Sequence, residues 1–350
     1  MSIELKTPIS DKVVKIGYQS GYDNIIMAIE SSCDETACAV VKNGREVLAN
    51  VVASQIKTHQ EFGGVVPEVA AREHLEAINV VIKEGFKQAG VNPDEITAFS
   101  STVGPGLVGS LLVGLNAAKT LAITYDKPFV GINHLSAHIC ANYINTDLEP
   151  PFLALLVSGG HTQIIIVKGY NDTKIIGETL DDATGEAYDK VARLLGLPYP
   201  GGVFLDKIAP NGNKDAYKLP VAKVEGYNFS FSGLKTAVLN LTKKLEKEFG
   251  EIPKEDVAAS FQECITKTLF DKVYKASKEF NINQIVLAGG VAANSEIRHK
   301  FFALKDQGYK VFAPEMKYCT DNASMVGACA YFSPSKELST LDTEVFSRCK

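Results

Sequence analysis

Short apolar runs alternate with stretches of helical periodicity along most of the chain, a pattern typical of strands alternating with helices. Residues 25–30 form an apolar run, residues 31–36 are polar, and residues 37–41 are apolar again, which predicts a β-hairpin with a polar tip. Pro67 then begins a stretch whose apolar residues recur at helical spacing, and proline is favoured in the first turn of a helix. The first structured segment is therefore predicted to be a hairpin followed by a helix.

The same alternation continues through the first half of the chain. A strand is predicted at 96–103, a glycine-rich turn at 104–109 and a buried helix at 110–123. A further strand at 129–132 leads into a helix that starts from Asn133.

The pattern then restarts after a boundary. Residues 145–151 read Asn-Thr-Asp-Leu-Glu-Pro-Pro, and prolines among polar residues stop both helices and strands. Beyond them a strand at 152–157, a tight polar tip and a return strand at 162–167 repeat the first hairpin, and a strand at 285–288 runs into a glycine-rich helix start. We expect an α/β fold of two duplicated lobes with a ligand between them. The predicted parts are an extension at 1–23, an N-terminal lobe at 24–150 and a C-terminal lobe at 151–350.

Composition and charge narrow the class of protein. A chain of 350 residues fits about two domains at roughly 150 residues each. With 45% hydrophobic and 22% charged residues, the composition excludes a disordered or collagen-like chain. The net charge of -5 argues against non-specific nucleic-acid binding over the whole surface, but it leaves a local basic groove open.

The cysteines and the N-terminus predict the compartment. Seven scattered cysteines, the last of them Cys349, contain no CxxC pair, so neither a zinc ribbon nor a redox pair is expected. No apolar run reaches the ~18 residues of a membrane span. The first 24 residues lack the layout of a signal peptide, and we expect a cytoplasmic protein.

Two histidines form the first candidate site. His134 and His138 lie four residues apart in a predicted helix, so both imidazoles can reach one cation. A third ligand must come from elsewhere, and Asp321 is the candidate, with Cys319 as a weaker one. The alternatives are two histidines without a ligand and an Asp321 that caps the last helix.

The histidine spacing also invites a metalloprotease interpretation. That motif places a glutamate directly after the first histidine as the general base, whereas Leu135 stands here. Gly-x-Ser-x-Gly is absent as well, so nucleophilic hydrolase chemistry has no support.

A glycine-rich turn in the first half fits GxGxxG with Gly104, Gly106 and Gly109, followed downstream by Asp126. It could be a dinucleotide fingerprint or a tight turn with close helix packing. The motif is not on the first strand, and Pro105 removes an N–H that a pyrophosphate would need. No GK[ST] follows, so a Walker P-loop is not predicted.

Glycine turns with nearby acids recur in the second half. At the tip 158–161 the glycines let backbone N–H groups point at a phosphate or carboxylate, although a purely structural turn is the alternative. At 181–190 two acids precede a glycine and a helix, whose N-terminus can hold an anion. Singly, each acid is more often solvated surface than a ligand. The candidate ligands in these turns are Asp189, Gly202, Asp206 and Asn294.

Nine motifs follow one another between about residues 25 and 330. They are Ile-Glu-Ser-Ser-Cys-Asp-Glu-Thr at 29–36, Gly-Gly-Val-Val-Pro-Glu at 63–68 with Arg72 and His74, Gly-Pro-Gly-Leu-Val at 104–108, His134 with His138, Leu-Val-Ser-Gly-Gly-His at 156–161, Tyr-Pro-Gly-Gly at 199–202, Phe-Ser-Phe-Ser-Gly-Leu-Lys at 229–235, Ala-Gly-Gly-Val-Ala-Ala-Asn at 288–294 and Cys-Thr-Asp-Asn at 319–322. Together they resemble the bacterial TsaD (Gcp/YgjD) family of tRNA threonylcarbamoyltransferases.

The resemblance implies a fold and a reaction. The fold is that of two ribonuclease-H-like lobes, as in actin, hexokinase and the heat-shock chaperone ATPases, around a nucleotide cleft. The reaction transfers the threonylcarbamoyl group from threonylcarbamoyl-AMP to N6 of the adenosine 3′ of the anticodon, in tRNAs that read codons beginning with A. The implied partners are a TsaB-type paralogue and a TsaE-type ATPase, and a TsaC-type enzyme supplies the intermediate.

The resemblance also implies site residues. An iron or zinc ion is held by the residues matching His134, His138 and Asp321. The nucleotide contacts match Leu156, Val157, Ser158, Gly159, Gly160, Asp189, Gly202, Asp206 and Asn294. One departure is visible: the family has Glu-Gly between the two histidines, whereas this chain has Ser-Ala at 136–137.

The chemistry of the reaction suggests further roles. Asp34 or Glu35 could accept the proton that leaves N6 or order a water, with a hydrogen-bonded turn as the alternative. Lys235 and Arg72 could touch tRNA phosphates or simply lie on a solvated face. A metal-dependent peptidase and a non-catalytic nucleotide-binding scaffold remain alternative functions.

Overall fold

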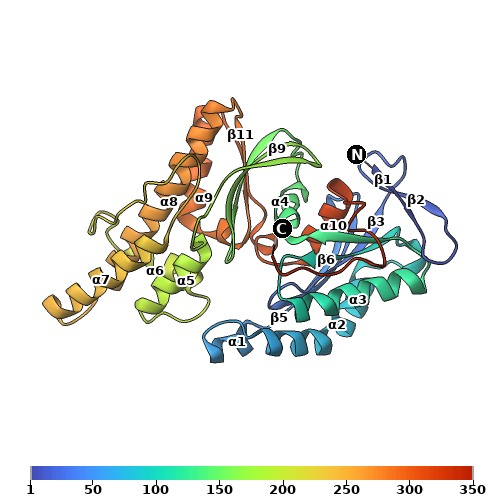
Figure 1. Ribbon diagram of the computed structural model, residues 1–350, viewed down its shortest axis with the longest axis horizontal. Coiled ribbons are helices and arrows are strands. Elements are labelled where there is room, and N and C mark those ends of the chain that lie inside the picture. Colours follow the sequence, from blue (N-terminus) through green and yellow to red (C-terminus); the bar gives the residue numbers. More distant parts are fainter. Residues whose placement is uncertain (1, 349–350) are drawn as a thin grey trace. The chain divides into compact units, whose positions relative to one another are not determined.

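The computed structural model describes residues 2–348, and the chain divides into two compact units (Figure 1). Within the described residues, the first unit comprises residues 2–149 and 314–348, and the second comprises residues 150–313. The last part of the chain therefore belongs to the first unit, whereas the sequence placed it in the second lobe.

The first unit is built on a mixed five-stranded sheet in the order β5-β4-β3-β6-β7. Strands β3 and β4 pair antiparallel, as do β4 and β5, whereas β6 pairs parallel with both β3 and β7. The predicted hairpin and the predicted strand-turn-helix after it are confirmed. The strands are β3 (Ile25–Glu30), β4 (Glu35–Lys42), β5 (Glu46–Ser54), β6 (Ala98–Gly104) and β7 (Phe129–Asn133).

Helices cover both faces of this sheet (Figure 1). Met27 and Ile29 of β3 pack in one core cluster with residues of α2 and α3, while Ala28 faces the opposite way, 3.5 Å from where a Cβ at Gly327 of α10 would lie. The helices of this unit are α1 (Ile56–Phe62), α2 (Pro67–Ala89), α3 (Val108–Thr124), α4 (His134–Cys140) and α10 (Ala323–Phe332).

The burial of α10 explains why the chain end joins the first unit. Every residue of α10 is buried. A helix that is apolar all round needs neighbours on every side, and β3, β4 and α4 supply them here. The tail after α10 continues on the same unit, where the Phe346 N–H donates to the Val103 carbonyl oxygen at 3.0 Å.

The predicted N-terminal extension also has structure. Strands β1 (Ser2–Lys6) and β2 (Val13–Gly17) form an antiparallel hairpin. The Ile9 N–H donates to Asp126 Oδ1 at 2.8 Å, and the Tyr18 N–H donates to the Tyr331 carbonyl oxygen at 3.0 Å. Residues without helical or strand periodicity are thus fastened to the first unit by hydrogen bonds.

The second unit repeats the sheet of the first. Its order is β10-β9-β8-β11-β12, with two antiparallel pairs followed by two parallel ones. The same order and the same sense of pairing confirm the predicted duplication and the α/β class. The strands are β8 (Phe152–Val157), β9 (Thr162–Gly169), β10 (Asp172–Glu178), β11 (Gln284–Ala288) and β12 (Lys310–Phe312).

One face of the second sheet carries the core of that unit. Leu153, Leu155 and Val157 alternate along β8 and pack in one cluster with residues of the helices. The helices are α5 (Thr184–Leu194), α6 (Gly201–Ile208), α7 (Ser232–Phe249), α8 (Lys254–Glu279) and α9 (Ser295–Phe302). A short 3-10 turn, η4 (Gly290–Ala293), stands between β11 and α9, where the sequence predicted that the helix would start directly from the glycines.

Two further expectations are tested by the described part of the chain. Among residues 2–348, none of the helices combines the length and the apolar character needed to cross a bilayer. The six cysteines among these residues form no disulfide with one another, and Cys349 lies outside them.

Candidate metal centre and nucleotide turns

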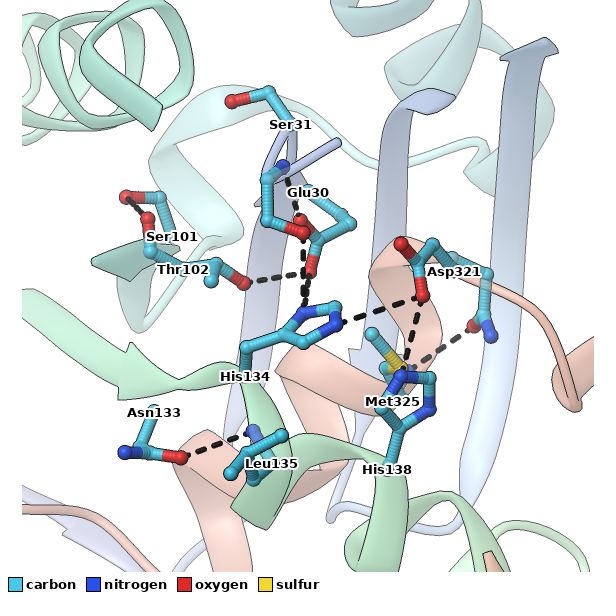
Figure 2. Close-up of polar contacts among 12 residues, drawn as sticks. Glu30, Ser31, Ser101, Thr102, Asn133, His134, Leu135, His138, Asp321 and Met325 are labelled. Atoms are coloured by element: carbon cyan, nitrogen blue, oxygen red, sulfur yellow. Dashed lines mark hydrogen bonds and ion pairs between the residues drawn. The ribbon is translucent and has the colours of Figure 1, made fainter. Parts of the chain in front are cut away.

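The two histidines are positioned by the start of α4 (Figure 2). Asn133 caps this helix, and its Oδ1 accepts hydrogen bonds from the backbone N–H groups of Leu135 at 2.9 Å and Ser136 at 3.2 Å. His134 is the first helical residue and His138 lies one turn later, so the two rings project from the same face. Their centroids are 4.6 Å apart.

Asp321, from the loop before α10, completes the cluster. Its Oδ1 lies 3.6 Å from His134 Nε2 and 3.2 Å from His138 Nε2. One ligand atom from each of the three residues lies within 4.8 Å of the others. Two imidazole nitrogens and one carboxylate oxygen form a donor set that suits zinc or iron, so these residues fit the expected metal.

Neither alternative for this loop, a helix cap by Asp321 or a metal ligand at Cys319, agrees with the structure. Asn322, not Asp321, caps α10, and its Oδ1 accepts from the Met325 N–H at 3.2 Å. The carboxylate of Asp321 is therefore left to face the histidines. Cys319 is not part of the cluster, because its thiol lies 3.5 Å from the Pro314 carbonyl oxygen and 3.6 Å from that of Glu315.

The charges in the cluster shift the pKa values of its members in opposite directions. Burial alone would lower the pKa of His134, but the charges of Asp321 and Glu30 raise it to about 9. Burial would raise the pKa of Asp321, but His134 and His138 lower it to about 2. The two carboxylates thus favour a proton on His134 as long as no cation competes for its Nε2.

The two histidines differ in how they are held. His134 Nδ1 lies 3.2 Å from Glu30 Oε2, whereas His138 Nδ1 is buried and has no hydrogen-bond partner among residues 2–348. His138 is 2% exposed, so water does not satisfy it readily. Its polar contact is instead made by Nε2, which lies 3.2 Å from Asp321 Oδ1.

Two further acids lie at the tip between β3 and β4. Asp34 is buried and Glu35 is half-buried. Burial, together with the charges of Asp321 and Asp34, raises the pKa of Glu35 to about 10. At neutral pH Glu35 is thus protonated, and its carboxyl is hydrogen-bonded to Asp34.

A buried histidine of α2, His74, contacts both ends of this tip. His74 Nε2 lies 3.0 Å from the Cys33 carbonyl oxygen, and His74 Nδ1 lies 2.7 Å from Thr36 Oγ1. A carbonyl oxygen can only accept, so Nε2 carries the proton and Nδ1 accepts from the threonine hydroxyl. The neutral imidazole thus joins both ends of the turn that holds the two acids.

The GxGxxG turn of the first unit serves packing. A Cβ at Gly106 would lie 2.7 Å from the Ser32 carbonyl oxygen, and one at Gly104 would lie within 3 Å of the backbone and ring of Phe346. A Cβ at Gly109 would lie 3.2 Å from Ala71. Neighbouring protein atoms occupy the space where a side chain would begin at each of these glycines. This favours the packing alternative over the dinucleotide fingerprint.

The hairpin tip of the second unit has the opposite character. Ser158 closes it with two hydrogen bonds to His161, N–H to carbonyl oxygen at 2.9 Å and Oγ from N–H at 3.1 Å. Gly159 and Gly160 are exposed, and within the described chain a Cβ on either would meet nothing within 4 Å. The two preceding residues of the expected contact set, Leu156 and Val157, lie inside β8 and are buried.

The other expected nucleotide residues form two linked pairs in the second unit. Asp189 Oδ1 accepts from the Gly202 N–H at 3.2 Å, and burial raises the pKa of Asp189. Asp206 Oδ1 accepts from Asn294 Nδ2 at 2.9 Å, and Asn294 also caps α9. A cavity of about 200 Å³ lies beside this second pair, lined in part by Ser295 and Gln262.

The two basic residues considered for tRNA phosphates lie on helices, one in each unit. Arg72 is exposed on α2 and pairs with Glu68 at 2.6 Å. Lys235 lies in the first turn of α7 and is half-buried. Their contact with tRNA stays a prediction.

One residue of the metal cluster escaped the sequence analysis. Glu30 ends β3 inside the motif at 29–36, yet no role was given to it. The signal was there, because a charged residue closing a fully apolar strand is buried only when it has partners.

The duplicated fold defines the class first: an actin-like α/β protein of two similar units, one of which carries a histidine-carboxylate cluster. A crystal structure of full-length HypF superposes with a TM-score of 0.60 at 14% identity over 94% of this chain and 50% of that one, a likeness of fold alone.

The sequence comparisons then give the family. The profile of the family described as "TsaD: tRNA N6-adenosine threonylcarbamoyltransferase" matches residues 46–328. Proteins of that enzyme name from Caldicellulosiruptor bescii and Clostridium perfringens are 52% and 55% identical over 89% and 88% of this chain, and over 94% and 92% of their own lengths. The chain belongs to the TsaD family, and it is a transferase whose family acts on tRNA.

Proposed function

We propose that this chain transfers the threonylcarbamoyl group of threonylcarbamoyl-AMP to N6 of the adenosine 3′ of the anticodon, in tRNAs that read codons beginning with A. The observation that carries the proposal is the cluster of His134, His138 and Asp321, found in a chain of this family. The peptidase alternative lacks its general base at Leu135, and a scaffold would not need three metal ligands.

We infer that His134 and His138, through Nε2, and Asp321, through Oδ1, hold one divalent iron or zinc ion. An ion held there would supply Lewis-acid polarisation of the carbamoyl oxygen, worth several kcal/mol toward the transition state. The N6 amine of adenosine needs this help, because its lone pair is delocalised into the ring.

The protein's own groups handle the proton and the leaving group. The bond from N6 to the carbamoyl carbon forms, the bond from that carbon to the phosphate oxygen breaks, and AMP leaves with the electron pair. A proton must leave N6, and we assign its acceptance to Asp34. Glu35 is protonated at neutral pH and donates to Asp34, so it positions the base instead of acting as one.

The AMP moiety is assigned to the second unit. The backbone N–H groups of exposed Gly159 and Gly160 suit the phosphate, since in the described chain nothing lies within 4 Å of where a Cβ on either residue would stand. Leu156, Val157 and Ser158 hold that tip in place. Asp189 with Gly202 and Asp206 with Asn294 are assigned to the nucleoside, because half-buried carboxylates and a buried amide suit ribose hydroxyls and base edges.

The reaction also implies partners. We propose that a TsaB-type paralogue and a TsaE-type ATPase work with this chain on tRNA, and that a TsaC-type enzyme supplies threonylcarbamoyl-AMP. We propose that this activity takes place in the cytoplasm, the compartment in which tRNA is available.

Reconstitution tests the proposal. Unmodified tRNA, threonine, bicarbonate and ATP are incubated with the chain, with and without the partner proteins, and nucleosides are read by mass spectrometry. His138→Ala should lower formation of the modified adenosine by about 10²-fold or more, because several kcal/mol of Lewis-acid assistance is lost. Nucleotide binding should be unchanged.

The matched control is His299→Ala on α9, because the His299 side chain is 81% exposed. It should modify tRNA at the wild-type rate. Equal activity of His138→Ala and wild type would refute the metal's role, and no modified adenosine from any mixture would refute the reaction.

A further inference from the structure

We propose that Glu30 is a positioning residue for the metal centre: it fixes the tautomer of His134, so that the Nε2 lone pair points toward Asp321 and the ion. This inference rests on the metal of the proposed function. Glu30 is the last residue of β3 and is fully buried, on the side of the His134 ring opposite to Asp321 (Figure 2).

Both carboxylate oxygens of Glu30 are engaged. Oε1 accepts from the Ser32 backbone N–H at 2.6 Å. Oε2 accepts from the Thr102 hydroxyl at 2.7 Å and lies 3.2 Å from His134 Nδ1. An ionised carboxylate only accepts hydrogen bonds, so Nδ1 of His134 must carry a proton and donate it to Oε2.

That requirement decides the other ring nitrogen. A neutral imidazole has one N–H, and with the proton at Nδ1 the lone pair is left on Nε2. Nε2 is the nitrogen that faces Asp321 Oδ1. The carboxylate thus orients the ring and selects its ligating tautomer, as a buried aspartate does for the histidine of a serine protease.

Ser32 is the competing neighbour. Its Oγ also lies 3.2 Å from His134 Nδ1, and a hydroxyl can either donate or accept. It therefore adapts to the tautomer that Glu30 imposes and does not impose one itself.

Glu30→Gln reverses the selection without changing the shape of the side chain. The Ser32 N–H can only donate, so the amide oxygen must face it and the amide NH₂ must face Thr102 and His134. The threonine hydroxyl adapts by accepting. His134 Nδ1 must then also accept, which places the proton on Nε2 and removes the lone pair that binds the ion.

The test measures metal affinity on the metal-free full chain, by competition between the protein and a chromogenic chelator for Zn²⁺. Glu30→Gln should weaken zinc binding by about 10- to 100-fold, the usual effect of losing such a partner of a ligating histidine. Thr102→Val is the matched control, because it removes another hydrogen bond from the same Oε2 but keeps the carboxylate. It should weaken binding by less than about fivefold.

A double-mutant cycle separates positioning from general damage. In a His134→Ala background, Glu30→Gln should cause no further loss of zinc affinity, since its effect passes through the ring that is already gone. Ser32→Ala provides a second variant of low folding risk, and it should bind zinc as tightly as wild type.

The outcomes decide between the claims. If wild type binds zinc and Glu30→Gln binds it within threefold as tightly, the inference is wrong and the proposed function stands. A tenfold loss in Ser32→Ala, or a full loss from Glu30→Gln on top of His134→Ala, also overturns it. If wild type itself binds neither Zn²⁺ nor Fe²⁺, the metal of the proposed function falls, and the inference falls with it.

Discussion

The hairpin tips of the two units occupy the same place in the same sheet topology, yet they carry opposite chemistry. The first tip, between β3 and β4, follows a buried carboxylate, Glu30, which is the last residue of β3. Asp34 and Glu35 stand at the other end of the tip, where β4 begins. The tip between β8 and β9 carries exposed Gly159 and Gly160 and no acid. The two units share one sheet topology, and the residues in the turns give the two tips different chemistry.

The neighbours of each tip account for the difference. In the first unit His74 of α2 contacts the tip at Cys33, and Gly106 of the 104–109 turn packs against Ser32, so the charges of the tip lie in a crowded, partly buried space. In the second unit the tip is tied mainly to itself and to Gly185, whose N–H donates to the Ser158 carbonyl oxygen at 3.1 Å. The first tip is suited to proton chemistry beside a cation and the second to holding an anion.

Exchanging the acids of the first tip for amides tests whether its charges do chemistry. Asp34→Asn should lower the rate of adenosine modification by about 10²-fold or more, the usual contribution of a general base. Glu35→Gln should lower it by less than about tenfold, because Glu35 is already protonated at neutral pH and the amide replaces a neutral group. Single-turnover rates by mass spectrometry measure both.

The contrast between the two variants is the informative result. Losses of equal size would mean that Glu35 shares the charge and that its raised pKa does not survive with metal and substrate bound. A normal rate in Asp34→Asn would reduce the first tip to a hydrogen-bonded turn.

The sequence predicted the hairpins of both units better than the membership of the chain's end. Alternating apolar runs gave both hairpins, because strand period and turn chemistry are local properties. The assignment of α10 failed, since nothing in its own apolar sequence says which sheet it will cover. The sequence of an apolar helix predicts that the helix is buried, but it does not predict which elements cover it.

The candidate site divides in the same way. The spacing of His134 and His138 is local and visible in the sequence, and Asp321 was already a candidate third ligand before the family resemblance matched all three residues to a metal site. The role of Glu30 depends on a contact between β3 and α4, more than a hundred residues apart, and on which oxygen each donor reaches. Only the folded chain shows that.

Adding a methyl group to a glycine of each tip region tests the difference between filled and open space. Gly106→Ala should destabilise the protein by about 1–3 kcal/mol, because its Cβ would lie 2.7 Å from the Ser32 carbonyl oxygen. Gly159→Ala should leave stability unchanged, since its Cβ meets nothing within 4 Å in the described chain, and it should weaken nucleotide binding by about tenfold. Urea unfolding and calorimetric titration with AMP measure the two effects.

Reversed results would break the comparison. A stable Gly106→Ala that loses nucleotide affinity would restore the dinucleotide interpretation of the first turn. Unchanged AMP affinity in Gly159→Ala would remove the second tip from the phosphate site.

The smallest expected effect comes from the histidine that braces the first tip. Burial lowers the pKa of His74, although the Cys33 carbonyl oxygen and the charges of Glu30 and Asp34 oppose this. The unfolded chain, with a histidine pKa of about 6.5, then binds more protons than the folded one in mild acid, so stability is lost as the pH falls below about 6.5. The loss cannot exceed about 1.4 kcal/mol per pH unit for one group.

Glutamine at this position keeps a donor for the Cys33 carbonyl oxygen but cannot take up a proton. His74→Gln should therefore lose less stability than wild type between pH 7.5 and 5.5, in urea midpoints measured side by side with His299→Ala as the exposed control. The same loss in all three chains would show that His74 is not held neutral, and the first tip would then lack the buried brace that sets it apart from the second.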